Sequence, residues 1–589
     1  MTAPRIALPP LLHARYVLPY YLHSKGTGPK LRIGLLLDSP TELIAPFAAC
    51  VDHILRSDFA SIELLIINGL PQAAPPAAKG KLSLLLSMLR DPKQRPRIAY
   101  SILDRWDRLR APELTAVLSE MDCSEAFSGI PSITVAPLVK GFVHRFPADA
   151  LATIRSYNLD VLIRFGFNIL RGEILESAKY GIWSYHHGDN DYYRGGPPHF
   201  WEVFERCPTS GVILQILTEE LDNGLVLDKA LSSTNCSVSP RANMLAPFAA
   251  GTTMLIRNLR NLHERGWDYL RQRAIPRADY LGKRKIYRAP TNLEVAQFAA
   301  PYIRQSAAGR IFGEPVYHWR VGLRPTRGDA IPRDPDGMVW KESPRGCYYA
   351  DPFLHEYKGK LYLFVEELPY ESWIGKISCA EVLADGSLGE MRPALETPYH
   401  LSYPFVFEEG GEVFMIPETE RNRSIEIYRA VEFPYKWKLE KVLYAAAGLD
   451  TTLHVQDGVY WFFTSLMDPP GAAPQLFLFH SESLTGEWNF HPQNPISKDV
   501  RFARNAGKLF RAEGALIRPN QDCSVRYGYG LHFHRVDALN ETQYKETLVH
   551  SILPSENSNY HGIHTFNRAG GFETMDKVRL EPLRKHRKT

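Results

Sequence analysis

The pattern of apolar and polar residues divides the chain into two halves. Up to about residue 235, short apolar runs alternate with segments whose apolar residues recur at helical spacing. Strands that alternate with helices in this way indicate right-handed βαβ units and a parallel sheet. The expected strands are 31–38, 62–67, 132–135, 161–164 and 181–185, and the expected helices are 41–56, 80–120, 148–157 and 171–178.

The second half has a different pattern. From about residue 316, short strands rich in Tyr, Phe, Val and Trp are separated by Gly-rich turns. Similar strand–turn–strand segments begin at Asp351, Tyr403 and Asp450. A repeat of roughly 50 residues with several strands per unit is typical of a β-propeller, and about five such units fit. An all-β sandwich is the alternative, and the recurring unit favours the propeller.

These patterns predict a multidomain chain, with an N-terminal α/β Rossmann-like domain and a C-terminal all-β five-bladed propeller. We find no signal peptide, because the N-terminus lacks a basic segment followed by an apolar core and a cleavage site. No stretch approaches the roughly 20 apolar residues of a transmembrane helix, so we expect no transmembrane segment and a cytoplasmic protein. The expected parts are an N-terminal extension (1–30), the α/β domain (31–235), a helical bridge (236–314), the propeller (315–578) and a basic tail (579–589).

Composition narrows the possible functions. The 589 residues include 69 Lys and Arg against 65 Asp and Glu, and the net charge of +4 does not suggest a nucleic-acid partner. The seven cysteines are odd in number and form no CxxC pair, so neither a disulfide framework nor a metal site is expected. No GxGxxG or GxxxxGK[ST] motif follows the first strand, so the usual nicotinamide or ATP site is not supported.

The richest polar stretch lies between residues 181 and 201, where His186 and His187 follow a predicted strand. Parallel sheets bind ligands at this end of their strands. Residues 209–227 then predict a strand, a tight turn and a returning strand. Together these segments resemble the formyltransferase fold of methionyl-tRNA formyltransferase, glycinamide ribonucleotide formyltransferase and sugar N-formyltransferases. That family has Asn-x-His, Arg-Gly, Thr-Gly-Val and Leu-Asp-x-Gly elements, and the counterparts here are Ser184-Tyr185-His186, Arg194-Gly195, Ser210-Gly211-Val212 and Leu221-Asp222-Asn223-Gly224.

The resemblance covers roughly residues 30–235 and implies formyl transfer to an amine from 10-formyltetrahydrofolate. His186 would then donate to the developing oxyanion and move a proton, and Asp222 would orient His186 and accept the proton lost by the amine. Ser184 stands where the family has its catalytic Asn, so the oxyanion contact is either remade by a water or by His187, or the chemistry has changed or been lost. The resemblance also implies a folate pocket at Phe165, Gly166, Phe167 and Leu221, with His187, Asp189 and Arg194 as further substrate-site candidates.

The second half carries candidate carboxylates. Ala350-Asp351-Pro352 resembles the first-blade element of five-bladed arabinanases and β-xylosidases, whose Asp is the general base, and Asp450 resembles their third-blade Asp. Their acid is a Glu in Glu-Gly-Pro, and the nearest counterpart is Glu513-Gly514. Glycoside hydrolysis needs two carboxyl groups at a fixed separation, which would be Asp351 and Glu513. Alternatively, Asp351 and Asp450 cap inner strands and bind a sugar or nothing.

Four further motifs lie in this half: His400-Leu-Ser-Tyr-Pro-Phe405, Met415-Ile-Pro-Glu418, Ala506-Gly-Lys-Leu509 and Arg518-Pro-Asn-Gln-Asp522. On these motifs, the chain over about 315–575 more closely resembles the N-terminal domain of plant glucosaminyl inositolphosphorylceramide transferases.

Glu366 and Glu418 end equivalent strands of successive repeats, and they face either one shared depression or the surface.

The leading hypothesis is formyl, or related one-carbon or acyl, transfer to the amino group of a sugar or sugar nucleotide in surface-glycan or glycolipid biosynthesis. The propeller would bind the carbohydrate. In one alternative the propeller is the catalyst, as a glycosyltransferase or glycosidase, beside a degenerate formyltransferase-like domain. In the other, the chain is a non-catalytic glycan-binding protein. The sequence does not indicate an oligomeric state.

Overall fold

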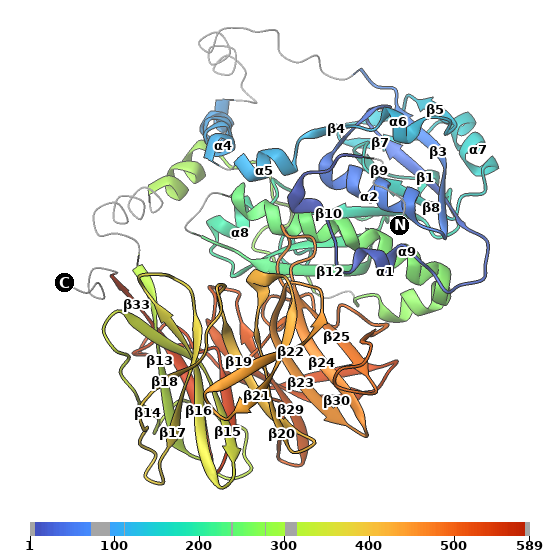
Figure 1. The fold of residues 1–589 in the computed structure, drawn as a ribbon. Helices are drawn as coiled ribbons and strands as arrows, with labels where there is room; N and C mark the ends of the chain where they lie inside the picture. The colour runs from blue at the N-terminus through green and yellow to red at the C-terminus, as the bar shows by residue number, and fades with distance from the viewer. Residues whose placement is uncertain are drawn as a thin grey trace. The chain divides into compact units, whose positions relative to one another are not determined.

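The computed structural model describes residues 6–71, 95–110, 112–236, 240–276, 279–300 and 315–582 (Figure 1). The chain forms two compact units. Unit 1 comprises Met1–Arg304 with Asp468–Ala473, and unit 2 comprises Gln305–Met467 with Pro474–Thr589. Much of the predicted helix 80–120 and most of the basic tail lie outside the described residues. The bounds of the five predicted parts stay predictions.

Unit 1 contains a seven-stranded sheet in the order β12-β11-β10-β8-β1-β3-β5. Five neighbouring strands are parallel; at one edge β11 pairs antiparallel with β10, and β12 pairs antiparallel with β11. The α/β prediction for this half is confirmed, because the predicted apolar runs form the parallel strands. The strands are β1 (Leu31–Leu37), β3 (Ala60–Asn68), β5 (Ser132–Val135), β8 (Val161–Arg164), β10 (Ile182–His186), β11 (Thr209–Ile216) and β12 (Leu225–Ser233).

Helices cover this sheet, and the longest, α9 (Leu245–Arg273), packs on β11, β12 and α2 (Ala45–Arg56). The core between the layers is built from apolar residues such as Leu36, Ile66 and Leu162, as expected for parallel strands covered on both faces. None of the helices within the described ranges combines the length and hydropathy that crossing a membrane requires. The other helices are η1 (Pro10–Leu12), α1 (Leu18–Tyr21), η2 (Arg95–Arg97), α4 (Ile98–Arg110), α5 (Pro112–Val117), α6 (Ser124–Phe127), α7 (Ala148–Ser156), α8 (Phe200–Phe204) and η4 (Ala242–Met244).

Two helix predictions in unit 1 need correction. The predicted helix 41–56 begins only at Ala45, because β2 (Glu42–Ile44) pairs with β4 (Glu120–Asp122). The predicted helix 171–178 is one short turn, η3 (Glu173–Glu176), because Gly172 has a φ of +82° and its N–H donates to Glu219. Three short strands complete the unit as a small sheet: β6 (Leu138–Lys140), β7 (Val143–Arg145) and β9 (Ile169–Leu170).

The described residues of unit 2 form five antiparallel sheets, which confirms the all-β prediction for this half. Three of them are meanders of consecutive strands that begin near 347, 402 and 448, in line with the predicted repeat. The sheets are β14 (Val339–Trp340), β13 (Pro315–Pro325), β33 (Phe572–Pro582) and β32 (Phe566–Ala569); β15 (Cys347–Tyr357), β16 (Lys360–Pro369), β17 (Lys376–Val382) and β18 (Arg392–Leu395); β19 (Ser402–Glu409), β20 (Glu412–Glu418), β21 (Ile425–Glu432) and β22 (Lys436–Tyr444); β23 (Gly448–Gln456), β24 (Val459–Leu466), β25 (Gln475–Ser481) and β26 (Asn489–Phe490); and β27 (Arg504–Asn505), β29 (Ala515–Asp522), β30 (Gly530–Leu539) and β31 (Tyr544–Ile552), with β28 (Phe510–Ala512) beside β29.

The first strands of the three meanders share one irregularity. Each contains a β-bulge, and the bulge holds a residue with positive φ: Asp351 (+49°), Tyr403 (+46°) or Asp450 (+48°). Non-glycine residues rarely adopt this conformation, and a bulky aromatic residue does so least readily. Strained positions of this kind cluster at functional sites, and bulges re-aim side chains. The repeat therefore brings three side chains to equivalent places.

Candidate functional site

The first group of candidate residues lies in unit 1, at the carboxyl end of β10. The Nδ1 atom of His186 is 3.5 Å from Oδ1 of Asp222, and its Nε2 atom is 2.8 Å from the carbonyl oxygen of Tyr193. Both side chains are largely buried. Because each ring nitrogen faces an acceptor, His186 is held between Asp222 and the Tyr193 carbonyl, and either nitrogen can carry the proton. The structure brings together the two residues that the formyltransferase motif singles out.

Asp222 is held in place by the Arg194-Gly195 loop. The N–H of Gly195 donates to Oδ2 of Asp222 at 2.9 Å, and Asp222 itself has a φ of +52°. Gly195 has a φ of +95°, and a Cβ atom there would lie 2.3 Å from the carbonyl oxygen of Tyr287. Only glycine fits this approach. The Arg-Gly element therefore serves to fix the Asp222 carboxylate.

Ser184 lies two residues before His186 on β10, so both side chains project from the same face of the sheet. Its hydroxyl accepts a hydrogen bond from Nη1 of Arg164 at 2.9 Å and donates to the carbonyl oxygen of Tyr185 at 3.3 Å. Arg164 ends β8 and is the register partner of Ser184. Arg164 thus joins the group, although the sequence analysis did not identify it.

His187 does not belong to this group, and its prediction as a substrate residue needs correction. Strand alternation turns it to the opposite face, where its ring stacks on Phe248 with centroids 3.6 Å apart. Both ring nitrogens are buried without a partner among the described residues. Burial lowers the pKa of His187 well below its ordinary value, so the ring is neutral.

Asp189 and Arg194 both serve the loop itself. Asp189 accepts a hydrogen bond from the Lys229 ammonium at 2.7 Å, so its charge is already paired. The Nε atom of Arg194 donates to the carbonyl oxygen of Asn190 at 2.9 Å, and its guanidinium lies over the Tyr280 ring. These contacts shape the polar loop after β10 and occupy both side chains.

Some groups of the segment predicted to line a folate pocket are already engaged within the protein. The N–H groups of Phe165 and Gly166 donate to the Leu36 carbonyl, and that of Phe167 donates to Asp38. The Phe167 ring packs into the sheet core. What this segment can offer a ligand is therefore its carbonyl oxygens and the half-buried Phe165 ring. Leu221 is also half-buried, next to Asp222 in the β11–β12 loop.

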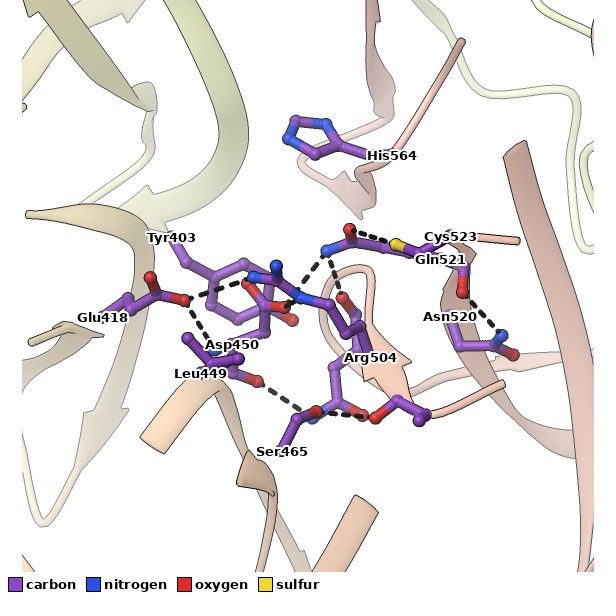
Figure 2. Close-up of polar contacts among 12 residues, drawn as sticks. Tyr403, Glu418, Leu449, Asp450, Ser465, Arg504, Asn520, Gln521, Cys523 and His564 are labelled. Carbon is purple, nitrogen blue, oxygen red and sulfur yellow. Dashed lines mark hydrogen bonds and ion pairs between the residues drawn. The ribbon is translucent and has the colours of Figure 1, made fainter. Parts of the chain in front are cut away.

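The second group lies in unit 2, around the bulge residue Asp450 (Figure 2). The Nε atom of Arg504 is 2.6 Å from Oδ2 of Asp450, and its Nη2 is 3.5 Å from Oε2 of Glu418. Oε2 of Glu418 also accepts the Asp450 N–H at 3.0 Å, and Gln521 donates to the Asp450 carboxylate at 3.2 Å. One guanidinium therefore bridges two carboxylates from different sheets.

Asp351 takes part in a buried chain with His564 and Asp576. Nδ1 of His564 is 2.6 Å from Oδ2 of Asp576, and its Nε2 is 3.5 Å from Oδ1 of Asp351. The Trp319 ring stacks on the imidazole with centroids 3.8 Å apart. Although burial alone would lower it, the two carboxylates raise the pKa of His564. The two carboxylates therefore favour the charged form of the imidazole, and so does the aromatic face above it.

Asp351, His564 and Asp576 are close enough together to hold a metal ion, since their ligand atoms lie within 4.8 Å of one another. The donors are otherwise engaged, however. Asp576 accepts the backbone N–H groups of Asp351, His564 and Thr565. A metal would need the neutral imidazole, whereas Asp351 and Asp576 favour its charged form. The three side chains therefore form an ion-paired cluster.

Glu366 and Glu418 are carboxyl groups that retain protons. Burial, reinforced by the Asp351 carboxylate, raises the pKa of Glu366 well above its ordinary value. Burial and the Asp450 carboxylate raise the pKa of Glu418 to about 8, although Arg504 opposes this. Nε2 of His400 lies 3.3 Å from Glu366. Carboxyl groups whose pKa values are raised in this way can act as general acids, which chemistry at a glycosidic bond requires.

The prediction that Glu513 is the acid partner of Asp351 needs correction. It lies exposed in the turn between β28 and β29 with a φ of +52°, and its N–H donates to the carbonyl oxygen of Asp329. Its carboxylate accepts the Ile331 N–H at 3.4 Å. The Glu-Gly dipeptide therefore forms a hairpin turn, and the positive φ of Gly514 suits glycine there. Glu513 does not join Asp351, Glu366, Glu418 and Asp450.

Comparison with known proteins relates unit 2 to a glycolipid-transferase family. Residues 339–577 match the family described as glucosamine inositolphosphorylceramide transferase 1, N-terminal. Over 207 residues, 34% of this chain, the sequence is 39% identical to that transferase of Oryza sativa subsp. japonica and 37% identical to that of Arabidopsis thaliana. The matched segment spans 28% and 27% of these relatives, so the chain covers less than a third of their length. The predicted resemblance over about 315–575 is confirmed.

Among solved structures, a sugar N-formyltransferase from Shewanella sp FDAARGOS_354 is similar to this chain. It is 12% identical with a TM-score of 0.25, over 44% of this chain and 75% of that one.

Four residues of the two groups escaped the sequence analysis: Arg164, Arg504, His564 and Asp576. His564 shows no carboxylate near it in the sequence, since its partners Asp351 and Asp576 lie on other strands. Arg504 precedes the Ala506-Gly-Lys-Leu509 element by two residues, a signal that could have identified it. Arg164 ends the strand that directly precedes the predicted folate segment, and no motif in the sequence marks it.

Proposed function

We propose that unit 1 transfers a formyl group, or a related one-carbon or acyl group, to the amino group of a sugar or sugar nucleotide in glycan or glycolipid assembly. The observation that carries the proposal is the His186–Asp222 contact of 3.5 Å at the end of β10. The proposed donor is 10-formyltetrahydrofolate, which would supply an activated formyl carbon next to the Phe165–Phe167 segment. The proposed donor site is limited to the carbonyl oxygens and the Phe165 ring described above.

The two residues have distinct tasks in this reaction. The amine nitrogen of the acceptor attacks the formyl carbon and forms a C–N bond, while the carbonyl electron pair moves to oxygen. His186 takes the proton lost by the amine. It passes that proton to the leaving nitrogen as the bond between that nitrogen and the formyl carbon breaks. Asp222 keeps the imidazole oriented and stabilises it while it is charged, which a carboxylate beside a catalytic His does elsewhere.

The acceptor class is supported by unit 2. The matched relatives are named glucosamine inositolphosphorylceramide transferases, and glucosamine is a sugar with a primary amine. We infer that the five sheets of unit 2 form a five-bladed propeller that binds this carbohydrate. Two observations support the inference: β13 pairs with β33 from the chain end, and the first strands of successive sheets contact one another. The bulge residues then face a common centre.

The test combines donor binding and turnover. Wild-type protein is titrated with 5-formyltetrahydrofolate by calorimetry and is assayed by mass spectrometry for N-formylation of amino-sugar nucleotides. His186→Ala and Asp222→Asn should abolish turnover while the fold survives. His23→Gln, a change of an exposed histidine with a side chain 66% accessible, should leave turnover unchanged. Wild-type turnover in both site variants would refute the proposal.

A second candidate function rests on the acid cluster of unit 2, which we define as Asp351, Glu366, Glu418 and Asp450. The pKa of Glu418, raised to about 8 by burial and by the neighbouring Asp450 carboxylate, favours acid–base chemistry at a glycosidic bond, as in glycosyl transfer or hydrolysis. If unit 2 is the catalyst, Glu418→Gln and Asp351→Asn should abolish conversion of a glycosylated substrate and leave unit 1 chemistry unaffected. Glu513→Gln is the matched control, because this exposed carboxylate lies outside the cluster. Normal conversion in both cluster variants would mean that these residues do not catalyse the reaction and at most bind the sugar.

A further inference from the structure

The guanidinium of Arg164 is fixed beside the proposed reaction centre. It ends β8, its register partner across the sheet is Ser184, and its Nη1 donates to Ser184 Oγ at 2.9 Å. Paired residues of neighbouring parallel strands project from the same face, and so do residues two apart on one strand. Arg164, Ser184 and His186 therefore share a face at the carboxyl ends of two adjacent strands.

The side chain of Arg164 is largely enclosed, yet it is not fully used. Its Nε atom is buried and has no hydrogen-bond partner among the described residues. Burial lowers the pKa of the guanidinium, and the carboxylates of Asp222 and Asp38 oppose that change. An arginine remains charged under such conditions. A buried charged donor without a partner is costly, so a ligand that accepts from it gains affinity.

We propose that Arg164, positioned by Ser184, donates to the oxygen of the group being transferred and makes this site specific for a small planar acyl or carboxylate group. The inference rests on the proposed acyl transfer and adds the donor for its oxyanion. As the amine nitrogen bonds to the acyl carbon, the carbonyl electron pair moves to the oxygen that faces Arg164. The pair returns when the bond to the leaving nitrogen breaks, and His186 carries the proton from one nitrogen to the other.

Geometry and charge both favour this assignment over the Ser184 hydroxyl itself. The single proton of that hydroxyl already donates to the Tyr185 carbonyl at 3.3 Å. A guanidinium offers several N–H groups in one plane, which match the two lone-pair directions of a carbonyl or carboxylate. The serine is therefore a positioning residue, and the arginine is the group that contacts substrate.

The experiment separates binding from turnover. Sodium formate serves as the probe for the planar group, and its binding is followed by ¹³C NMR line broadening with labelled formate. We expect affinity of about millimolar order, since a ligand of three heavy atoms cannot bind much more tightly. Arg164→Met should abolish binding, Arg164→Lys should retain part of it, and Arg155→Met, which changes an exposed arginine of α7, should leave it intact. His186→Gln should also bind formate, because the guanidinium remains.

Turnover is measured on the same variants with saturating acceptor. Arg164→Met should lower kcat by about 10²–10³-fold with a smaller change in KM, as loss of an oxyanion donor does. Ser184→Ala should lower kcat less. Formate binding that is absent in the wild type, or unchanged in Arg164→Met, would overturn the inference. Arg164-dependent formate binding without any acyl transfer would uphold the specificity for a planar carboxylate, but would refute the proposed function and the oxyanion role with it. Normal turnover in Arg164→Met would overturn the inference and uphold the proposed function.

Discussion

The Nε atom of Arg504 lies 2.6 Å from Oδ2 of Asp450, so a buried ion pair joins the fifth sheet of unit 2 to the fourth. Desolvating two charges is costly, but removing one partner leaves the other uncompensated in a low-dielectric interior. The pair therefore acts as a fixed connection at the point where the acid cluster is assembled.

Replacing Arg504 by Met should destabilise unit 2 by about 3–5 kcal/mol, the usual cost of breaking a buried pair from one side. Urea denaturation measures this. Asp450→Asn in addition should cost less than the sum of the single changes, because both act on one pair. The control is Arg535→Met, which breaks a pair with Asp537 whose arginine is 49% exposed and should cost under about 1 kcal/mol. Equal losses at both pairs would contradict this expectation.

Glu202 predicts a pH-dependent stability of unit 1. It is buried in α8, and burial raises its pKa to about 8. The folded state then binds more protons than the unfolded state between about pH 4.5 and pH 8, so stability from this group is lost as pH rises through that window. Glu202→Gln keeps the shape and has no charge to lose. The Tm of this variant, relative to wild type, should rise by several degrees between about pH 5 and pH 8.

Glu176→Gln is the control for this measurement, because Glu176 is exposed in η3. Its Tm difference from wild type should stay constant over the same pH range. A Glu202→Gln difference that is flat, or that falls with rising pH, would show that Glu202 is ionised in the folded protein.

The sequence predicted the parts of the fold that follow from local pattern. Apolar runs such as 161–164 predict strands because a parallel sheet is covered on both faces, so its strands are almost entirely apolar. His186 and Asp222 were found because their motif elements keep their order and spacing. Asp351 and Asp450 are candidates because their segments resemble elements of five-bladed glycosidases, and the structure places both at equivalent bulges.

What the sequence could not supply are contacts made across strands. Arg164 meets Ser184 only because β8 and β10 are neighbours, and Asp576 meets Asp351 although 225 residues separate them. Glu513 was mistaken for an acid because a Glu-Gly dipeptide also suits a hairpin turn. His187 was mistaken for a site residue because the sequence shows adjacency to His186, whereas strand alternation sends the two rings to opposite faces.

Tyr403 offers a test of the strained bulge in β19. Its buried hydroxyl accepts the Gly507 N–H at 2.7 Å and lies 2.7 Å from Oγ1 of Thr452. Tyr403→Phe leaves that N–H without its acceptor, which should lower the free energy of unfolding by about 1–3 kcal/mol. Chemical denaturation measures the loss, and Tyr317→Phe, at a half-buried tyrosine of β13, is the control. An unchanged free energy of unfolding in Tyr403→Phe would contradict this expectation and would mean that water or another group replaces the hydroxyl.

Gly195 links backbone geometry to the proposed chemistry. A Cβ atom there would lie 2.3 Å from the Tyr287 carbonyl oxygen, and its φ of +95° is unfavourable for alanine. Gly195→Ala must therefore shift the N–H that donates to Asp222 and, through Asp222, the orientation of His186. Misplacing a catalytic group by about 1 Å can cost on the order of 10²-fold in rate. We expect kcat for formyl transfer to fall by at least about tenfold, with a smaller effect on acceptor KM.

The neighbouring Gly196 supplies the matched control for this change. A Cβ atom at Gly196 would find its nearest neighbour at 3.7 Å, an ordinary contact, so Gly196→Ala should keep most of its turnover. Circular dichroism and Tm of both variants separate loss of fold from loss of orientation. If Gly195→Ala folds and turns over like the wild type, Asp222 does not need the loop to hold it, and its role in orienting His186 would have to be abandoned.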